Sequence, residues 1–435
     1  MMAATSNSGN FLATDIPNDD FLTQCMHCGL CLPVCPTFAI TGREKSSPRG
    51  RIRLIKSVAE GKLGMTEGFI DEMNFCLDCQ ACETACPAGV KYGALVESAR
   101  NQIRLQGKQG RGEKILKKIF LRNILSNKNQ LKFVAKVLWI YQNRGIEWFL
   151  KITRIAEFLT PKLSKLQELS PRADREFFDE THLEVIVPRN PPKYKVGFLS
   201  GCLMNVAFSK ENDDTIKILL HHDCEIIIPK EQVCCGSLQA HNGDFETARE
   251  LAKKNVDVFT QYQFDAIVMN SAGCGAFMKE YGHYLHDDPV YAERAASLSG
   301  KIKDISEFLF EIGLKMPEHP FNKRVTYHDA CHLVHAQKIS QQPRTLLKKI
   351  PGLQYVELPE ASWCCGSAGI YNVTQYEDSM IMLDRKMTNL ALTECDYVVA
   401  NNPGCLTQMQ YGIRKQKMHM EVIHFVTLLR KAYGL

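Results

Sequence analysis

Two nearly identical cysteine patterns near the N-terminus constrain the fold of this chain more than any other feature. The first pattern is Cys25, Cys28, Cys31 and Cys35, followed by Pro36, and the second is Cys76, Cys79, Cys82 and Cys86, followed by Pro87. Both have the C-x2-C-x2-C-x3-C-P spacing of bacterial ferredoxins, in which each pattern supplies ligands to a [4Fe–4S] cluster. We therefore expect a small domain built around two such clusters.

The spacing also predicts how the ligands are shared. In two-cluster ferredoxins the fourth Cys, which precedes the Pro, ligates the other cluster. We assign the first cluster to Cys25, Cys28, Cys31 and Cys86. We assign the second cluster to Cys76, Cys79, Cys82 and Cys35. Zinc is the alternative, because C-x2-C pairs also bind zinc, but the third Cys and the following Pro favour iron–sulfur clusters.

The remaining cysteines form a second pattern that occurs twice. The chain has 18 Cys, and none lies between Cys86 and Cys202. The first copy contains Cys202, Cys234, Cys235 and Cys274, and the second contains Cys331, Cys364, Cys365 and Cys405. The offsets between successive members agree within one residue, which indicates an internal repeat. The two other cysteines, Cys224 and Cys395, each precede an expected strand, and we interpret them as small buried side chains.

Buried apolar runs alternate with helical patterns over the same region, as in an α/β fold. The expected strands are 195–199, 225–228 and 266–269 in the first copy, and 324–327, 354–358 and 397–400 in the second. The fold class is therefore α+β multidomain. We expect a helical two-cluster ferredoxin domain at 1–104, a basic helical connector at 105–192, and two homologous α/β Cys-Cys-Gly units at 193–315 and 322–435.

Each unit places its cysteines after strands, where the loops of an open α/β sheet form binding sites. Four thiols could then converge on a further iron–sulfur cluster or on zinc. Thiol–disulfide chemistry and purely structural thiols remain open alternatives. His328, His332 and His335 lie around Cys331 and could be ligands or proton carriers, although we expect structural histidines with satisfied hydrogen bonds.

The connector is strongly basic. Residues 104–172 contain 16 Lys or Arg and 4 Glu, and apolar residues recur between them at helical spacing. Such a segment suits an anionic membrane surface or an acidic partner, and an ordinary solvated helical face is the alternative. Nucleic acid is not expected as a partner, because no recognised binding motif accompanies the charge.

Several features are missing from the sequence. It contains no G-x-G-x-x-G fingerprint, no P-loop and no H-E-x-x-H motif. Oxidation of an organic substrate therefore calls for a separate flavin-bearing subunit. The N-terminal residues are polar and do not resemble a secretory signal, and no run of 18 apolar residues occurs. We expect a cytoplasmic protein with free thiols.

The motifs resemble those of the glycolate oxidase iron–sulfur subunit family. The resemblance lies in Cys25–Cys31, in Ser47–Arg51, in the block from Ser271 to Phe277 that continues through Gly282, and in Trp363–Gly369. It runs from about residue 20 to the end of the chain. The Cys-Cys-Gly repeats are also similar to those of anaerobic glycerol-3-phosphate dehydrogenase, lactate-utilisation proteins and heterodisulfide reductase. Ser271 and Asn402 stand where heterodisulfide reductase has a further Cys, which argues against a five-thiolate cluster.

The resemblance implies an electron-transfer subunit without catalytic residues of its own. Its partners would be FAD-containing subunits that oxidise glycolate to glyoxylate, and its electrons would pass toward the quinone pool at the inner face of the cell membrane. The eight N-terminal cysteines match the family's cluster ligands. Alternatives are the equivalent subunit of lactate or anaerobic glycerol-3-phosphate oxidation, or a membrane-docking scaffold whose clusters are only structural.

Overall fold

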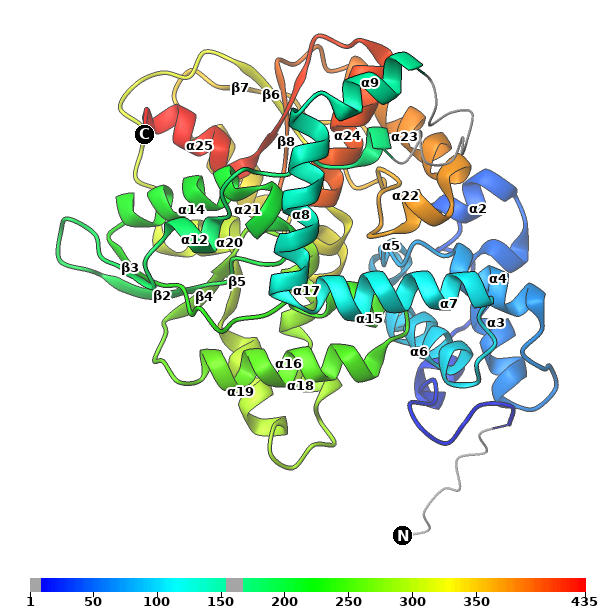
Figure 1. The fold of residues 1–435 in the computed structure, drawn as a ribbon. Coiled ribbons are helices and arrows are strands. Elements are labelled where there is room, and N and C mark those ends of the chain that lie inside the picture. The colour runs from blue at the N-terminus through cyan, green and yellow to red at the C-terminus, as the bar shows by residue number, and fades with distance from the viewer. Residues whose placement is uncertain (1–8, 154–166) are drawn as a thin grey trace.

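The computed structural model describes residues 9–153 and 167–435, and it contains two β-sheets that lie side by side within one body (Figure 1). In these described parts, no helix is both long and apolar enough to span a membrane. Helices dominate the rest of the chain, as the α+β prediction requires.

The first sheet belongs to the first Cys-Cys-Gly unit and has the order β1-β3-β2-β4-β5. Strands β2 to β5 are parallel, and the short β1 pairs antiparallel with β3. The strands are β1 Val185–Ile186, β2 Tyr194–Phe198, β3 Cys224–Ile227, β4 Ala266–Met269 and β5 Ile302–Asp304. The run of buried residues in β4 explains why its apolar pattern was continuous rather than alternating.

The second sheet repeats this arrangement. Its order is β7-β6-β8-β9, with every pair parallel. The strands are β6 Arg324–Tyr327, β7 Gln354–Tyr355, β8 Tyr397–Ala400 and β9 Glu421–His424. The order matches β3-β2-β4-β5 position by position, so the two units share one topology. The cysteine repeat therefore marks a structural repeat.

Helices fill the space between the sheets and cover their outer faces. The first unit contains α13 Leu203–Ala207, α14 Ser209–His221, α15 Ser237–His241, α16 Phe245–Phe259, α17 Ala272–Lys279, α18 Tyr281–Tyr284, α19 Ala292–Lys301 and α20 Ile305–Ile312. The second contains η3 His332–Ala336, α21 Gln341–Lys348, α22 Tyr371–Thr374, α23 Tyr376–Ala391, α24 Pro403–Gln416 and α25 Phe425–Tyr433. Helix α14 packs on α25 and α20 packs on α21, which gives the two units one shared apolar core.

The N-terminal domain is a set of short helices held around the cysteine loops. They are α1 Asp19–Thr23, α2 Pro36–Thr41, η1 Glu44–Ser46, α3 Pro48–Ala59, α4 Glu67–Phe75, α5 Ala81–Thr84 and α6 Tyr92–Leu105. Helix α3 begins at the predicted turn, where the Ser47 hydroxyl accepts a hydrogen bond from the Gly50 amide. The apolar faces of α3, α4 and α6 form the core of this domain.

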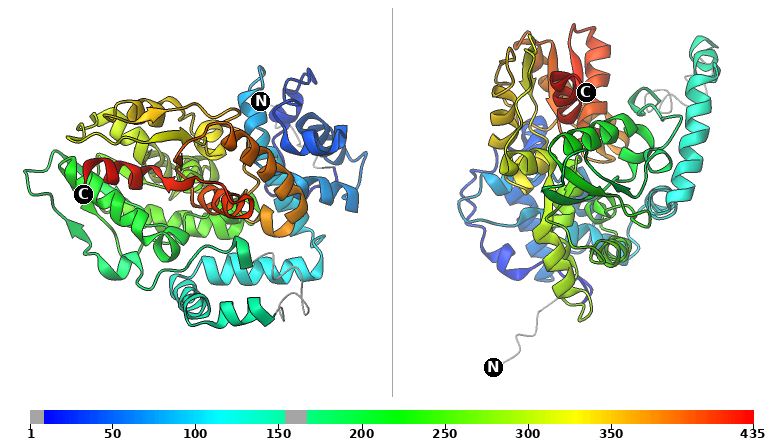
Figure 2. Two further views of the ribbon diagram at one scale, coloured as in Figure 1. Left: turned by 90° about the horizontal axis from the view of Figure 1, so that it is seen from above. Right: turned by 90° about the vertical axis from the view of Figure 1, so that its left-hand side faces the viewer.

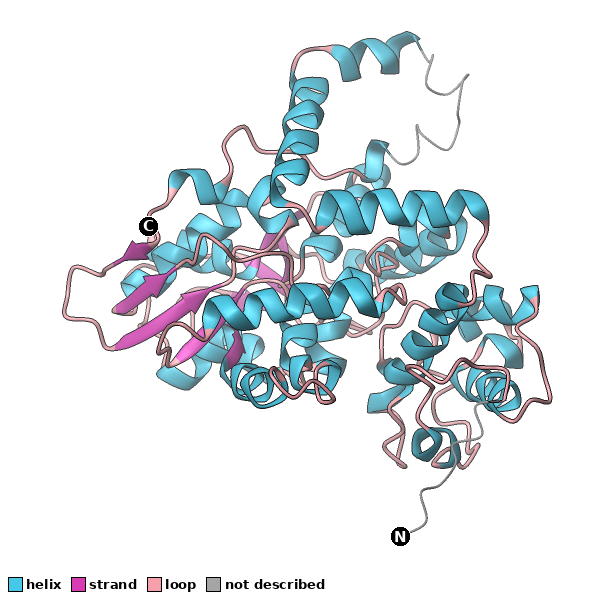
Figure 3. Ribbon diagram, turned by 60° about the horizontal axis from the view of Figure 1, so that its bottom comes forward, coloured by secondary structure: helices cyan, strands magenta, loops and turns pink. Residues whose placement is uncertain are grey.

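The connector forms an arm that lies against the first unit and then leaves the body. It consists of α7 Arg111–Lys117, the π-helix η2 Lys118–Leu125, α8 Lys128–Asn143 and α9 Ile146–Thr153. Leu121, Leu125 and, at the start of α8, Leu131 pack against Phe177 and Val206. The far end of α8 and the helix α9 project from the body (Figures 2 and 3). The helical character of the connector agrees with its sequence pattern.

Three strands and one helix lack a sequence signal, and a fourth strand is shorter than expected. Strands β1, β5 and β9 each have two to four residues and carry no clear apolar run, which leaves little periodic signal. The stretch 354–358 is a strand only at Gln354–Tyr355. The Pro-rich end of the connector also contains β1 and the helix α12 Phe178–Thr181, because Phe177 and Phe178 are buried there.

Candidate iron–sulfur and thiol sites

The first group of ferredoxin cysteines surrounds a single small cavity near the surface. Cys25, Cys28, Cys31 and Cys86 all line it, together with Cys82. The Cys28 side chain is exposed, so this group lies close to solvent. Three of these thiols come from one loop and the fourth from the other loop, which is the combination that the sequence predicts.

The second group lies deeper, around Cys76. The Asp78 amide and the Tyr92 hydroxyl donate to Cys76 Sγ at 3.3 and 3.4 Å. Burial raises the pKa of Cys82, and the neighbouring charges of Cys79, Cys76 and Cys35 raise it further. A buried thiol of this kind becomes a thiolate only when a cation is present, as a metal centre provides. The donor set, four thiols with hydrogen bonds to sulfur, therefore fits an iron–sulfur cluster.

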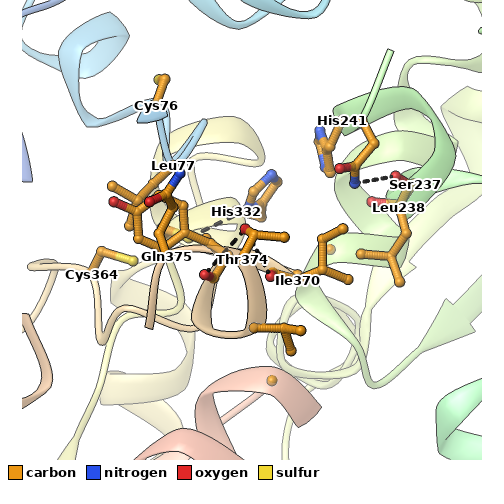
Figure 4. A pocket seen from close by; sticks show the side chains of 18 of the residues that line it. Cys76, Leu77, Ser237, Leu238, His241, His332, Cys364, Ile370, Thr374 and Gln375 are labelled. Atoms are coloured by element: carbon orange, nitrogen blue, oxygen red, sulfur yellow. Dashed lines mark hydrogen bonds between the residues drawn. The ribbon is translucent and has the colours of Figure 1, made fainter. Parts of the chain in front are cut away.

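The eight thiols of the two repeated units face one central cavity. This cavity has a volume of about 950 Å³ and is also lined by Cys76 of the ferredoxin domain. Figure 4 shows Leu77, His241, His332 and Cys364 around it, contributed by three different parts of the chain. The convergence follows from topology, because the cysteine loops lie at the carboxyl ends of parallel strands in both sheets.

In the first unit the four thiols form a chain of contacts. Cys202 Sγ and Cys234 Sγ lie 3.6 Å apart. Hydrogen bonds from Cys202 and Cys235 lower the pKa of Cys234, and a hydrogen bond with Cys235 lowers that of Cys274. Two thiolates bound at ~2.3 Å to one tetrahedral metal atom lie ~3.8 Å apart, so this spacing fits shared coordination.

In the second unit the thiols form a corresponding chain of contacts. A hydrogen bond with Cys364 lowers the pKa of Cys331, and hydrogen bonds with Cys364 and Cys405 lower that of Cys365. The amide of Gly366 donates to Cys364 Sγ at 3.4 Å. All 18 cysteines of the chain are free, so no disulfide joins any of these neighbours.

Ser271 and Asn402, which stand where heterodisulfide reductase has a further Cys, hydrogen-bond the neighbouring thiols. Ser271 hydrogen-bonds Cys274, and Asn402 Nδ2 donates to Cys405 Sγ at 3.6 Å. Asn402 Oδ1 also accepts a hydrogen bond from the Gly273 amide at 3.3 Å, which ties the two units together beside the cavity. Cys224 and Cys395 are buried away from it, as predicted.

The three histidines near Cys331 differ in their surroundings. His335 Nδ1 lies 3.0 Å from Thr84 Oγ1, and His332 Nδ1 lies 3.4 Å from Cys331 Sγ. His328 is buried, and within the described residues its ring nitrogens interact with the Cys365 thiol rather than with a nitrogen or oxygen partner. His328 is thus the histidine of the three that lies against the Cys365 and Cys405 thiols.

A buried polar network between the ferredoxin domain and the first unit has no counterpart in the sequence analysis. His241 Nδ1 contacts Glu97 Oε1 and lies 3.3 Å from Asp78 Oδ2, while the Tyr284 hydroxyl donates to Glu97 Oε2. Arg100 donates to the His241 carbonyl oxygen at 2.7 Å. These residues lie far apart in the sequence, and only their shared proximity to cysteine loops could have indicated the contact.

Comparisons with family models divide the chain in the same way as its cysteines. The 4Fe-4S dicluster domain matches residues 21–90, and the cysteine-rich CCG domain matches 196–279 and 325–410. The linker region of the glycolate oxidase iron–sulfur subunit matches 112–170. These matches, together with the donor sets described above, show that the protein carries iron–sulfur clusters.

Known relatives match over nearly the whole chain. A probable glycolate oxidase iron–sulfur subunit of Bacillus subtilis is 40% identical over 95% of this chain and 94% of its own. The glycolate oxidase iron–sulfur subunit of Escherichia coli is 30% identical over 92% of this chain and 93% of its own. Lactate utilization protein A of Oceanobacillus iheyensis is 29% identical over 54% of this chain and 96% of its own. The chain belongs to the family of glycolate oxidase iron–sulfur subunits.

Proposed function

We propose that this protein is the electron-transfer subunit of a flavin-dependent glycolate dehydrogenase complex. A partner subunit with FAD oxidises glycolate to glyoxylate, and this chain receives the electrons. The eight N-terminal cysteines hold two [4Fe–4S] clusters in the crossed sets Cys25, Cys28, Cys31, Cys86 and Cys76, Cys79, Cys82, Cys35. The clusters would supply one-electron redox chemistry, while the protein fixes their positions and environments.

One observation carries this proposal: the thiol groups follow one another through the molecule. The first group reaches the surface, and the second is buried behind it. Leu77 and Cys79 of the second group pack with Cys364 and Tyr371 of the second unit. Burial raises the pKa of the Cys79 thiol, and the nearby charge of Cys331 raises this pKa further. A structural scaffold would not need its redox centres to lie in contact in this way.

The proposed acceptor is a quinone, which would place the complex in the cytoplasm at the inner face of the membrane. The arm supports this location, because its outer surface is apolar and its flanks are basic. Phe133, Val137 and Ile140 are exposed at i, i+4 and i+7 on α8, and Trp148 is exposed on α9. An amphipathic helix of this kind suits an anionic lipid surface.

The experiment is co-purification with the candidate flavoprotein subunits, followed by a comparison of substrates. The complex should contain flavin, and glycolate should bleach the visible iron–sulfur absorption under anaerobic conditions. Lactate and glycerol-3-phosphate serve as comparison substrates. If either of them bleaches the absorption faster than glycolate, that compound is the substrate. Bleaching by none of the three would contradict the proposed function.

A further inference from the structure

The two repeated units differ at one position that faces the thiols. Three residues before its first Cys, the first unit has Leu199 and the second has His328. Each follows its strand directly, β2 or β6, and each is only 1% exposed. The same position of the repeat therefore has an imidazole in one copy and an apolar side chain in the other.

The surroundings of His328 are those of a ligand rather than of a core histidine. One of its ring nitrogens, Cys365 Sγ and Cys405 Sγ all lie within 4.8 Å of one another. Within the described residues, no nitrogen or oxygen atom is placed to hydrogen-bond the ring nitrogens of His328. The imidazole interacts instead with the Cys365 thiol, whose pKa is lowered by Cys364, by Cys405 and by this imidazole. A nitrogen at ~2.1 Å and a sulfur at ~2.3 Å from one tetrahedral metal atom lie ~3.6 Å apart, which is compatible with this cluster.

The second unit also has other basic side chains next to its thiols. The buried Lys386 donates to the carbonyl oxygens of Glu360 and Ala361 at 2.7 and 3.2 Å, and its charge acts on Cys364 and Cys365. His332 contacts Cys331. The thiols of the first unit instead interact with one another, with Ser271 and with Gln239.

We propose that His328 is a nitrogen ligand of an iron–sulfur centre in the second unit, where it takes the place of one of the four thiolates of Cys331, Cys364, Cys365 and Cys405. This makes the second unit a mixed histidine–cysteine site and the first an all-thiol site. A neutral imidazole in place of a thiolate removes negative charge from a centre and raises its reduction potential, as in Rieske proteins. The second unit is therefore the more easily reduced of the two. The inference rests on the proposed function only in placing redox centres in the repeated units.

The test uses the full chain, purified anaerobically with ¹⁵N-labelled histidine, reduced with dithionite and measured by pulsed EPR. We expect a ¹⁵N coupling from a directly bound histidine in the wild type. His328→Cys should remove the coupling, retain the iron and shift the potential of one centre to a more negative value. His328→Leu, which copies the residue of the first unit, should also remove the coupling and provides a second variant should the first not fold.

Two control variants separate His328 from other buried histidines. His332→Asn and His222→Gln should both retain the coupling, since His332 contacts Cys331 from outside the proposed ligand set and His222 lies away from the cavity. Loss of the coupling in His332→Asn would overturn the assignment to His328.

Two further EPR results would overturn the proposal: no histidine coupling in the wild type, or a coupling that persists in both His328 variants. Two results of metal analysis would also overturn it: zinc in the second unit, or only about eight irons per chain, which is the content of two four-iron clusters. None of these results affects reduction of the ferredoxin clusters by the flavoprotein and glycolate. Failure of this inference is thus distinguishable from failure of the proposed function.

Discussion

At the scale of single residues, the contact between the ferredoxin domain and the first unit includes one buried imidazole, that of His241. Burial alone would lower the pKa of His241, but the Glu97 and Asp78 carboxylates outweigh it and raise this pKa to about 10. Because the unfolded-state value is about 6.5, the protonated histidine stabilises the fold fully below about pH 6.5. That contribution is lost as the pH rises toward 10.

We therefore predict that Glu97→Gln lowers stability and weakens its dependence on pH. Removing one charge of a buried ion pair costs roughly 3 kcal/mol, and most of this loss should appear near neutral pH. Thermal unfolding midpoints measured between about pH 6.5 and 9.5 test this, with the exposed Glu250→Gln as the control. Parallel pH curves for Glu97→Gln and the wild type would contradict the assignment of a protonated His241.

At the scale of elements, the Cys-Cys-Gly loop requires its glycine for a structural reason. Gly366 has φ +89°, and a Cβ added there would lie 2.5 Å from the Ser379 carbonyl oxygen. Gly236 holds the same place in the first unit with φ +94°. The motif thus combines two thiols with a turn that no side chain allows.

Gly366→Ala should destabilise the protein by at least about 1–2 kcal/mol, the cost of a left-handed residue, with the clash adding to it. Thermal unfolding and iron content measure the effect. Gly64→Ala is the matched control, because Gly64 has an ordinary φ and open space around its Cα. An equal response of the two variants would show that the loop conformation does not limit stability.

The arm is the element that we expect to bind membranes. Phe133 and Trp148 are 70% and 67% exposed, and burying each in a lipid interface would contribute about 1.5–3 kcal/mol. Phe133→Glu with Trp148→Glu should therefore reduce binding to vesicles that contain anionic lipid by tenfold or more.

Flotation with such vesicles measures this binding. Leu183→Glu with Val290→Glu places the same charges at two exposed apolar positions outside the arm and should leave binding unchanged. Equal binding by all three proteins would remove the arm from membrane association. If the wild type binds the flavoprotein but not the vesicles, and the arm variant loses this binding, the arm is a partner-binding surface.

At the scale of the whole molecule, most of the architecture could be predicted from spacing. The cysteine offsets predict a duplicated unit, and the two sheets share one strand order. The loops of Cys234 and Cys364 converge because parallel strands place their carboxyl ends together. The spacing could not predict contacts between distant segments, such as that of Glu97 with His241. It also could not predict the short strands β5 and β9, which pair through backbone atoms and carry little side-chain signal.

The sequence also could not show that the two sheets face one cavity with the ferredoxin domain at its side. That arrangement depends on the shared core of α14, α20, α21 and α25, where no residue has a distinctive chemistry. It places Cys79 and Cys364 in one apolar cluster, so that the thiol groups form the series on which the proposed electron transfer depends.

The most direct measurement is EPR of the assembled complex after anaerobic addition of glycolate. Electron transfer through this chain predicts reduced iron–sulfur signals comparable to those obtained with dithionite, and their loss when a soluble quinone is added. Clusters that stay oxidised while the flavoprotein turns over glycolate would contradict the account.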